Sequence, residues 1–161
     1  MKKEYINSSL GPLNAPSPRN CGDCNQSSLN VPPTPIRKRR ILCVDDEIVG
    51  TTMRGEILKE NGYSVVLYHC PLAALSCDLS VFDLALLDFH MPELNGRELF
   101  LRMRAFGARF PIVLLTGNLG ALSHEDRVLF ARCIDKCTPI QYLLETIEEF
   151  LDPKQFPDFG V

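Results

Sequence analysis

The chain has 161 residues, of which 45% are hydrophobic and 23% are charged, and its formal net charge is −3. This length and composition are typical of one soluble domain with a single core. No segment approaches the roughly 20 apolar residues that cross a bilayer, and no apolar stretch follows the N-terminal lysines. We therefore expect neither membrane insertion nor export. The seven cysteines, an odd number, fit a protein of the reducing cytoplasm.

The N-terminal part of the chain differs in composition from the rest. Residues 1–36 hold six of the twelve prolines, many Ser and Asn, and no periodic pattern, so we expect residues 1–39 to form a disordered arm. Cys21 and Cys24 have the spacing of a metal or dithiol pair, but they lack the second ligand pair or the βα unit that such sites use. A metal or redox role for this pair is therefore disfavoured.

The arm ends in the basic run IRKRR, residues 36–40. Residues 1–40 carry seven Lys and Arg against two acids, a balance of +5, which leaves −8 for residues 41–161. Basic runs bind nucleic acid in some proteins, but a short one beside a fold is more often a solvated entry to its first strand. Nucleic-acid binding is therefore the weaker interpretation.

From residue 40 onward, short apolar runs alternate with helical patterns. Strands are predicted at residues 40–44, 63–68, 82–87, 110–115 and 132–135. Helices are predicted between them, after Glu47 up to Asn61, at 71–79, at 95–106, between Ser123 and Ala131, and at 140–151. Five strands alternating with five helices predict an α/β fold, a doubly wound parallel sheet of the flavodoxin-like strand order 2-1-3-4-5.

Polar residues stand where the predicted strands end. In such a sheet the C-terminal ends of the strands share one edge, where ligands bind. Asp45 and Asp46 follow the first strand, Asp88 the third, Thr116 the fourth and Lys136 the fifth. Three crowded carboxylates require a cation, and hard oxygen ligands suit Mg²⁺. With a lysine and a hydroxyl beside them, these groups could hold a phosphoryl group on a carboxylate.

Simpler interpretations remain for each residue alone. Asp88 could cap the following helix, Asp45 or Asp46 could cap the first helix, and Lys136 could pair with Asp135. Because these residues all fall on one edge of neighbouring strands, we favour a shared site. No G-x-G-x-x-G or G-x-x-x-x-G-K-[ST] motif follows a strand, which argues against a nucleotide site.

Four segments carry a family resemblance over residues 40–152, which we take as one domain: ILCVDDE, LALLDFHMPELNG, PIVLLTG and CIDK. In order and spacing they resemble the signatures of the response-regulator receiver domain of two-component signalling. The resemblance implies that Asp88 accepts a phosphoryl group from a histidine kinase or a phosphotransfer protein. It also implies that Thr116 and Lys136 bind the phosphoryl oxygens.

The resemblance further implies a magnesium site. Asp46, Asp88 and the backbone carbonyl of His90 would ligate Mg²⁺, and Asp45 would act through water. A receiver domain is a signalling module and not an enzyme in its own right.

Two positions depart from the family pattern. Cys133 stands where the family usually has an aromatic residue whose rotation reports phosphorylation, and Cys137 stands where proline is common. A cysteine is too small to fill the space that Thr116 would vacate. Either Phe130 fills that space or the loop at 117–120 and the short helix after it carry the response, and we favour the loop.

The expected function is therefore that of a stand-alone receiver domain, with residues 153–161 as a C-terminal tail and no output domain. It would signal by docking on an unidentified protein, or act as a phosphate relay or sink. One alternative is a DNA-associated regulator that uses the basic arm. Another is an aspartyl-phosphate phosphohydrolase, but those enzymes usually have a second acid two residues after the nucleophile, where this chain has His90.

Overall fold

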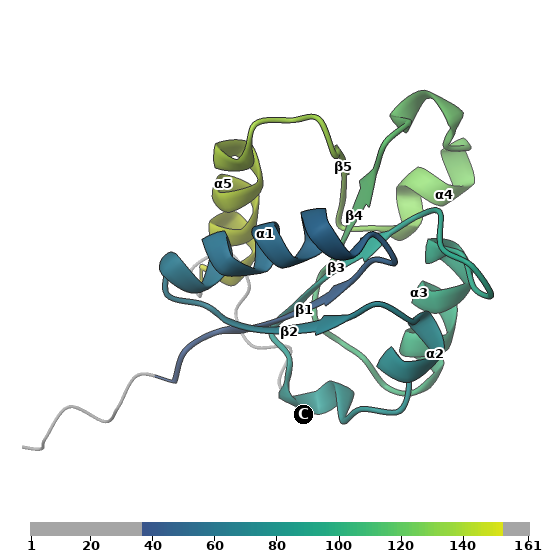
Figure 1. Ribbon diagram of the computed structural model, residues 1–161. Helices are drawn as coiled ribbons and strands as arrows, with labels where there is room; N and C mark the ends of the chain where they lie inside the picture. Colours follow the sequence, from purple (N-terminus) through teal and green to yellow (C-terminus); the bar gives the residue numbers. More distant parts are fainter. Residues whose placement is uncertain (1–36, 153–161) are drawn as a thin grey trace, which may run out of the picture. The chain divides into compact units, whose positions relative to one another are not determined.

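A computed structural model describes residues 37–152 of the chain. These residues form one five-stranded sheet of order β2-β1-β3-β4-β5, and all four strand pairings are parallel (Figure 1). The predicted α/β fold and its strand order are confirmed. The predictions for the N-terminal arm before residue 37, for Cys21 and Cys24, and for the tail at 153–161 concern residues outside the described part.

The strands are β1 (Arg40–Val44), β2 (Ser64–Tyr68), β3 (Leu84–Asp88), β4 (Ile112–Thr116) and β5 (Arg132–Asp135). β3 and β4 are buried along their whole length, as expected for apolar strands covered on both faces. β3 and β4 begin later than predicted; Phe82 and Phe110 precede these strands and pack edge to face, with ring centroids 6.3 Å apart. Asp88 is the last residue of β3, and every residue of this strand is buried.

The helices are α1 (Ile48–Glu60), α2 (Pro71–Ala74), α3 (Gly96–Ala105), α4 (His124–Leu129) and α5 (Ile140–Leu151), with 3₁₀ turns η1 (Leu79–Val81) and η2 (Leu119–Ala121). The prediction of a helix through residue 79 was wrong. That helix stops at Ala74, and the Asp78 carboxylate accepts a hydrogen bond from the Ser80 amide, which starts the separate turn η1. Within residues 37–152, no helix is long and apolar enough to span a membrane.

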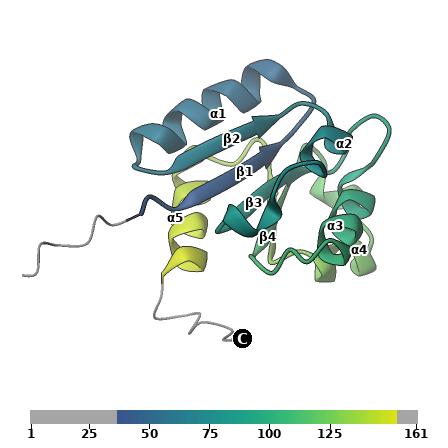
Figure 2. The same ribbon diagram turned by 90° about the horizontal axis from the view of Figure 1, so that it is seen from below.

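The sheet separates two apolar clusters. On β1, Leu42 and Val44 face the cluster that includes residues of α2 and α3, whereas Ile41 and Cys43 face the cluster that includes α1 and α5. Figure 2 shows these helices around the sheet. Because helices cover both faces of the sheet, polar side chains can gather at its C-terminal edge, where the strands end.

Candidate functional site

Three carboxylates meet at the ends of the adjacent strands β1 and β3. Asp45 is 2% exposed and Asp88 is 4% exposed, whereas Asp46 is open to solvent. Each offers a carboxylate oxygen, and these oxygens lie within 4.8 Å of one another. The structure thus brings together the three acids that the sequence placed at one edge.

The capping interpretations of these acids were wrong. Asn95 caps α3, and together with Glu98 it forms a reciprocal capping box, so Asp88 is not needed there. Glu47 caps α1 by accepting hydrogen bonds from the amides of Val49 and Gly50. The burial of Asp45 and Asp88 therefore has no explanation in helix capping.

Lys136 bridges two of the acids. Its Nζ lies 3.0 Å from Asp45 Oδ2 and 3.1 Å from Asp88 Oδ1, so it pairs with these acids and not with Asp135. The backbone fixes its position, because the Lys136 amide donates to the carbonyl of Thr116 at 2.8 Å. Burial acts to lower the pKa of Lys136, but its hydrogen bonds to Asp45 and Asp88 and their charges outweigh it and raise this pKa. Lys136 is therefore a cation.

Asp88 lies in an environment that disfavours its charge. Burial raises the pKa of the Asp88 carboxyl above its ordinary value, and the hydrogen bond and charge of Lys136 oppose this rise only in part. A divalent cation would stabilise the ionised carboxylate further. The clustered hard oxygen donors of Asp45, Asp46 and Asp88 fit Mg²⁺, which keeps several waters in its shell.

Thr116 and His90 flank this group. Thr116 is the last residue of β4, fully buried, and its Oγ1 accepts a hydrogen bond from the Asn118 amide at 3.3 Å. His90 lies in the loop that leaves β3, with an exposed side chain. The roles of Thr116 in phosphate binding and of the His90 carbonyl in metal binding stay predictions.

The turn that leaves the site is tightly packed against the strand end. A Cβ atom on Gly96 would lie 2.5 Å from the backbone oxygen of Asp88 and 3.0 Å from Cα of Phe89. The Gly96 amide also donates to the Phe89 carbonyl at 2.9 Å. Glycine is thus required because α3 begins in direct contact with the backbone that carries Asp88.

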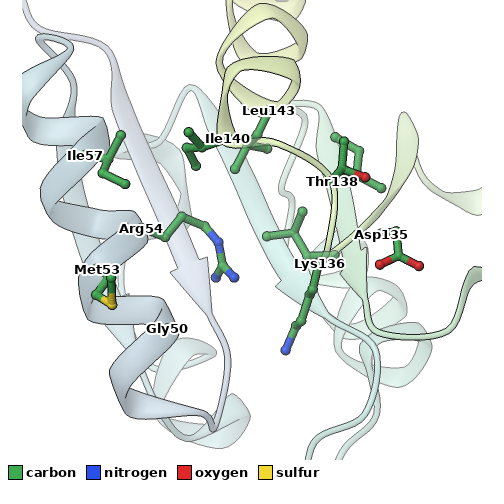
Figure 3. Close-up of a pocket in the computed structure, with 11 residues that line it drawn as sticks. Gly50, Met53, Arg54, Ile57, Asp135, Lys136, Thr138, Ile140 and Leu143 are labelled. Carbon is green, nitrogen blue, oxygen red and sulfur yellow. The ribbon is translucent and has the colours of Figure 1, made fainter.

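The sequence reasoning missed Arg54. Its Nη1 lies 3.3 Å from Asp45 Oδ2, and its side chain is 14% exposed. Together with Lys136 it points into a cavity of about 230 Å³ between α1 and the start of α5 (Figure 3). The sequence did contain a hint of this role. Gly50, Arg54 and Ile57 are spaced i, i+4 and i+7, so they share one face of the helix, and a charged side chain is unexpected on a face with such neighbours.

Cys133 lies on the edge strand β5 and is partly buried. Its Sγ is 3.9 Å from the carbonyl of Arg127, in α4. Nearby, Phe130 is buried and packs edge to face on Phe100 of α3, with ring centroids 5.1 Å apart. Phe130 is therefore already part of the core, and the role of Cys133 in a switch stays a prediction.

Residues 41–148 match the response regulator receiver domain family. The chain belongs to this family, whose members are the phosphoacceptor modules of two-component systems and interact with histidine kinases or phosphotransfer proteins. The resemblance seen in the sequence is thereby confirmed.

The sensor protein GacS of Pseudomonas syringae pv. syringae is 33% identical over 124 residues, which cover 73% of this chain and 13% of that protein. The transcriptional regulatory protein RprY of Bacteroides fragilis is 39% identical over 81 residues, covering 50% of this chain and 34% of that protein. The chain therefore corresponds to a small part of these relatives.

Solved structures agree over nearly the whole of the matched chains. A CheY-like receiver domain protein from Methanospirillum hungatei is 28% identical, with a TM-score of 0.64 over 74% of this chain and 98% of that chain. The response regulator TrrA from Thermotoga maritima, solved in complex with Mg²⁺ and BeF, is 29% identical, with a TM-score of 0.62 over 70% of this chain and 99% of that chain.

Proposed function

We propose that Asp88 is the residue that accepts the phosphoryl group, from a histidine kinase or a phosphotransfer protein and with Mg²⁺ as cofactor. One observation carries this proposal: Lys136 Nζ bridges Asp45 and Asp88 at 3.0 and 3.1 Å beside three clustered carboxylates. A cation held at this point is poised to pair with a phosphoryl oxygen on Asp88.

The transfer asks mainly for position and charge neutralisation. A carboxylate oxygen of Asp88 would attack the phosphorus of a phosphohistidine. The new O–P bond forms while the P–N bond breaks, and the electron pair of that bond returns to the imidazole nitrogen. Lys136 would then bind one phosphoryl oxygen, and the hydroxyl of Thr116 would donate to another.

The acids around Asp88 would hold the cofactor. Asp46, Asp88 and the carbonyl of His90 are the proposed direct ligands, with Asp45 acting through water. When bound, Mg²⁺ would neutralise charge on the phosphoryl oxygens. The carboxylates, hard donors clustered at one edge, support this assignment.

The phosphorylated domain would act in the cytoplasm by docking on another protein, which we do not identify. The changing surface would be the segment from residue 117 to 131. The DNA-associated alternative has less support, because Arg37 and Arg39 already pair with Asp83, at 2.7 and 3.3 Å. The phosphohydrolase alternative lacks the second acid, since His90 stands in its place.

The test is covalent labelling. The full-length protein is incubated with an acyl phosphate, with and without Mg²⁺, and its intact mass is measured. We expect one added phosphoryl group that requires Mg²⁺. Asp88→Asn and Asp46→Ala should abolish it, whereas Asp78→Asn, an exposed acid that caps η1, should label like the wild type. Equal labelling of Asp88→Asn and the wild type would show that the assignment is wrong.

A further inference from the structure

Asp45 is held by two cations. Lys136 Nζ lies 3.0 Å and Arg54 Nη1 lies 3.3 Å from the same oxygen, Oδ2. Figure 3 shows Arg54 extending from α1 and Lys136 extending from the segment after β5, on different sides of the cavity between α1 and α5. The other oxygen of Asp45, Oδ1, accepts a hydrogen bond from the Glu47 amide at 3.0 Å. Both oxygens of this carboxylate therefore have partners.

The Arg54 contact differs from an ordinary surface ion pair. The side chains of Asp45 and Arg54 are 3% and 14% exposed, so solvent and salt screen their attraction only weakly. The guanidinium of an arginine is a permanent cation, so Arg54 always places a positive charge beside Asp45. Its positive charge therefore always lies beside the carboxylate cluster of Asp45, Asp46 and Asp88.

We propose that Arg54 is a positioning residue that holds Asp45 and weakens the binding of Mg²⁺ to the acidic cluster. The inference rests on the proposed magnesium-dependent function of this cluster. Arg54 and a divalent cation are both attracted by the negative charge of Asp45, and they repel each other. By linkage, each weakens the interaction of the other with the site.

Arg54 also has a role once Asp88 carries a phosphoryl group. Lys136 would then turn toward the phosphoryl oxygens and give up part of its contact with Asp45. A buried carboxylate without a partner is costly, and Arg54 remains in place to pair with it. Arg54 thus keeps Asp45 oriented in both states.

Magnesium affinity is the direct test. The chain has no tryptophan, so MgCl₂ titrations of the full-length protein are followed by backbone amide NMR signals. Replacing Arg54 by Gln should lower the Kd for Mg²⁺ about 3- to 10-fold, because one nearby positive charge is lost. Arg54→Lys should return the Kd to within about twofold of the wild type. The matched control is Lys59→Gln, which removes an exposed cation further along α1 and should leave the Kd unchanged.

The outcomes separate this inference from the proposed function. If the wild type binds no Mg²⁺, the proposed function itself fails. If the wild type binds Mg²⁺ and Arg54→Gln binds it no more tightly, the role of Arg54 is wrong and the proposed function stands. Should Arg54→Gln fail to fold, the wild type still decides: the Arg54 Nε–Hε signal must shift with the same Kd as the Asp88 amide, and a stationary signal overturns the inference.

Discussion

The acidic edge, formed by Asp45, Asp46 and Asp88 at the ends of β1 and β3, is packed differently from the segment that runs from η2 to β5. The acidic edge is built on β1 and β3; every residue of β3 is buried, including Asp88. By contrast, α4 has six residues and none of them is buried, and only one of the four residues of β5 is buried. One sheet can therefore hold buried charges firmly at one edge while a helix beside it has few buried contacts and can rearrange more easily.

Polar contacts connect the loosely packed segment to its surroundings. Arg97 of α3 pairs with Asp126 of α4 at 2.9 Å, and the guanidinium of Arg127 donates to the carbonyl oxygens of Leu119 and Leu122. The Arg97–Asp126 pair is partly exposed, and pairs that solvent can reach contribute little to stability, commonly less than about 1 kcal/mol. A change at the proposed phosphorylation site could therefore move α4 at low cost.

The largest expected effect tests the rigidity of the acidic edge. Gly96→Ala should lower the free energy of unfolding by about 2 to 3 kcal/mol, because the new Cβ would lie 2.5 Å from the Asp88 backbone oxygen. In the loose segment, Gly120→Ala places its Cβ 3.4 Å from Asn118 Oδ1 and should change stability by less than about 0.5 kcal/mol. Urea unfolding measures the free energy of unfolding of both variants. If both variants lost the same amount of this free energy, the two regions would not differ in packing as we propose.

A smaller effect is expected from the buried charge itself. Because burial raises the pKa of the Asp88 carboxyl, ionised Asp88 destabilises the fold, and Asp88→Asn should stabilise it by roughly 1 kcal/mol without Mg²⁺. This gain is fully present above the folded-state pKa of Asp88. It should disappear as the pH falls below the ordinary carboxyl value of about 4.

Thermal unfolding of Asp88→Asn and the wild type across this pH range measures the effect. The matched control is Asp78→Asn, which should not stabilise the fold, because hydrogen bonds from Ser80 lower the pKa of the exposed Asp78 carboxyl. A wild type that is more stable than Asp88→Asn at neutral pH would mean that Lys136 outweighs the cost of burial.

The smallest expected change is at Cys133. A phosphate mimic at Asp88 should shift the backbone NMR signals of residues 117–131 strongly and that of Cys133 weakly. No residue of α4 is buried, whereas Phe130 is buried, packs against Phe100 and is not free to rotate into space vacated by Thr116. Large shifts in β5 and α5 with a silent loop would show that the response follows another route.

The helices, the strands and their order along the chain could largely be predicted from the residues. Hydrophobic period and caps are local properties, so the five strands, the capping of α4 by Ser123 and the end of α1 before Gly62 could be predicted from the residues alone. The winding rules for parallel strands then placed Asp45, Asp46 and Asp88 at one edge. The length of the helix predicted at 71–79 was overestimated, because the side chain of Asp78 forms local hydrogen bonds with Ser80 that compete with a continued helix.

The pairing of the charged side chains could not be predicted, because it depends on the packing of the elements against one another. Arg54 is nine residues from Asp45 along the chain, and its contact depends on how α1 lies against the sheet. Likewise, Lys136 could have paired with its neighbour Asp135, and the packing of β5 beside β4 directs it to Asp45 and Asp88 instead. The sequence gives the identity of each side chain. Its partners depend on the distances between helices and strands, and these distances are set by the packing of the two apolar clusters.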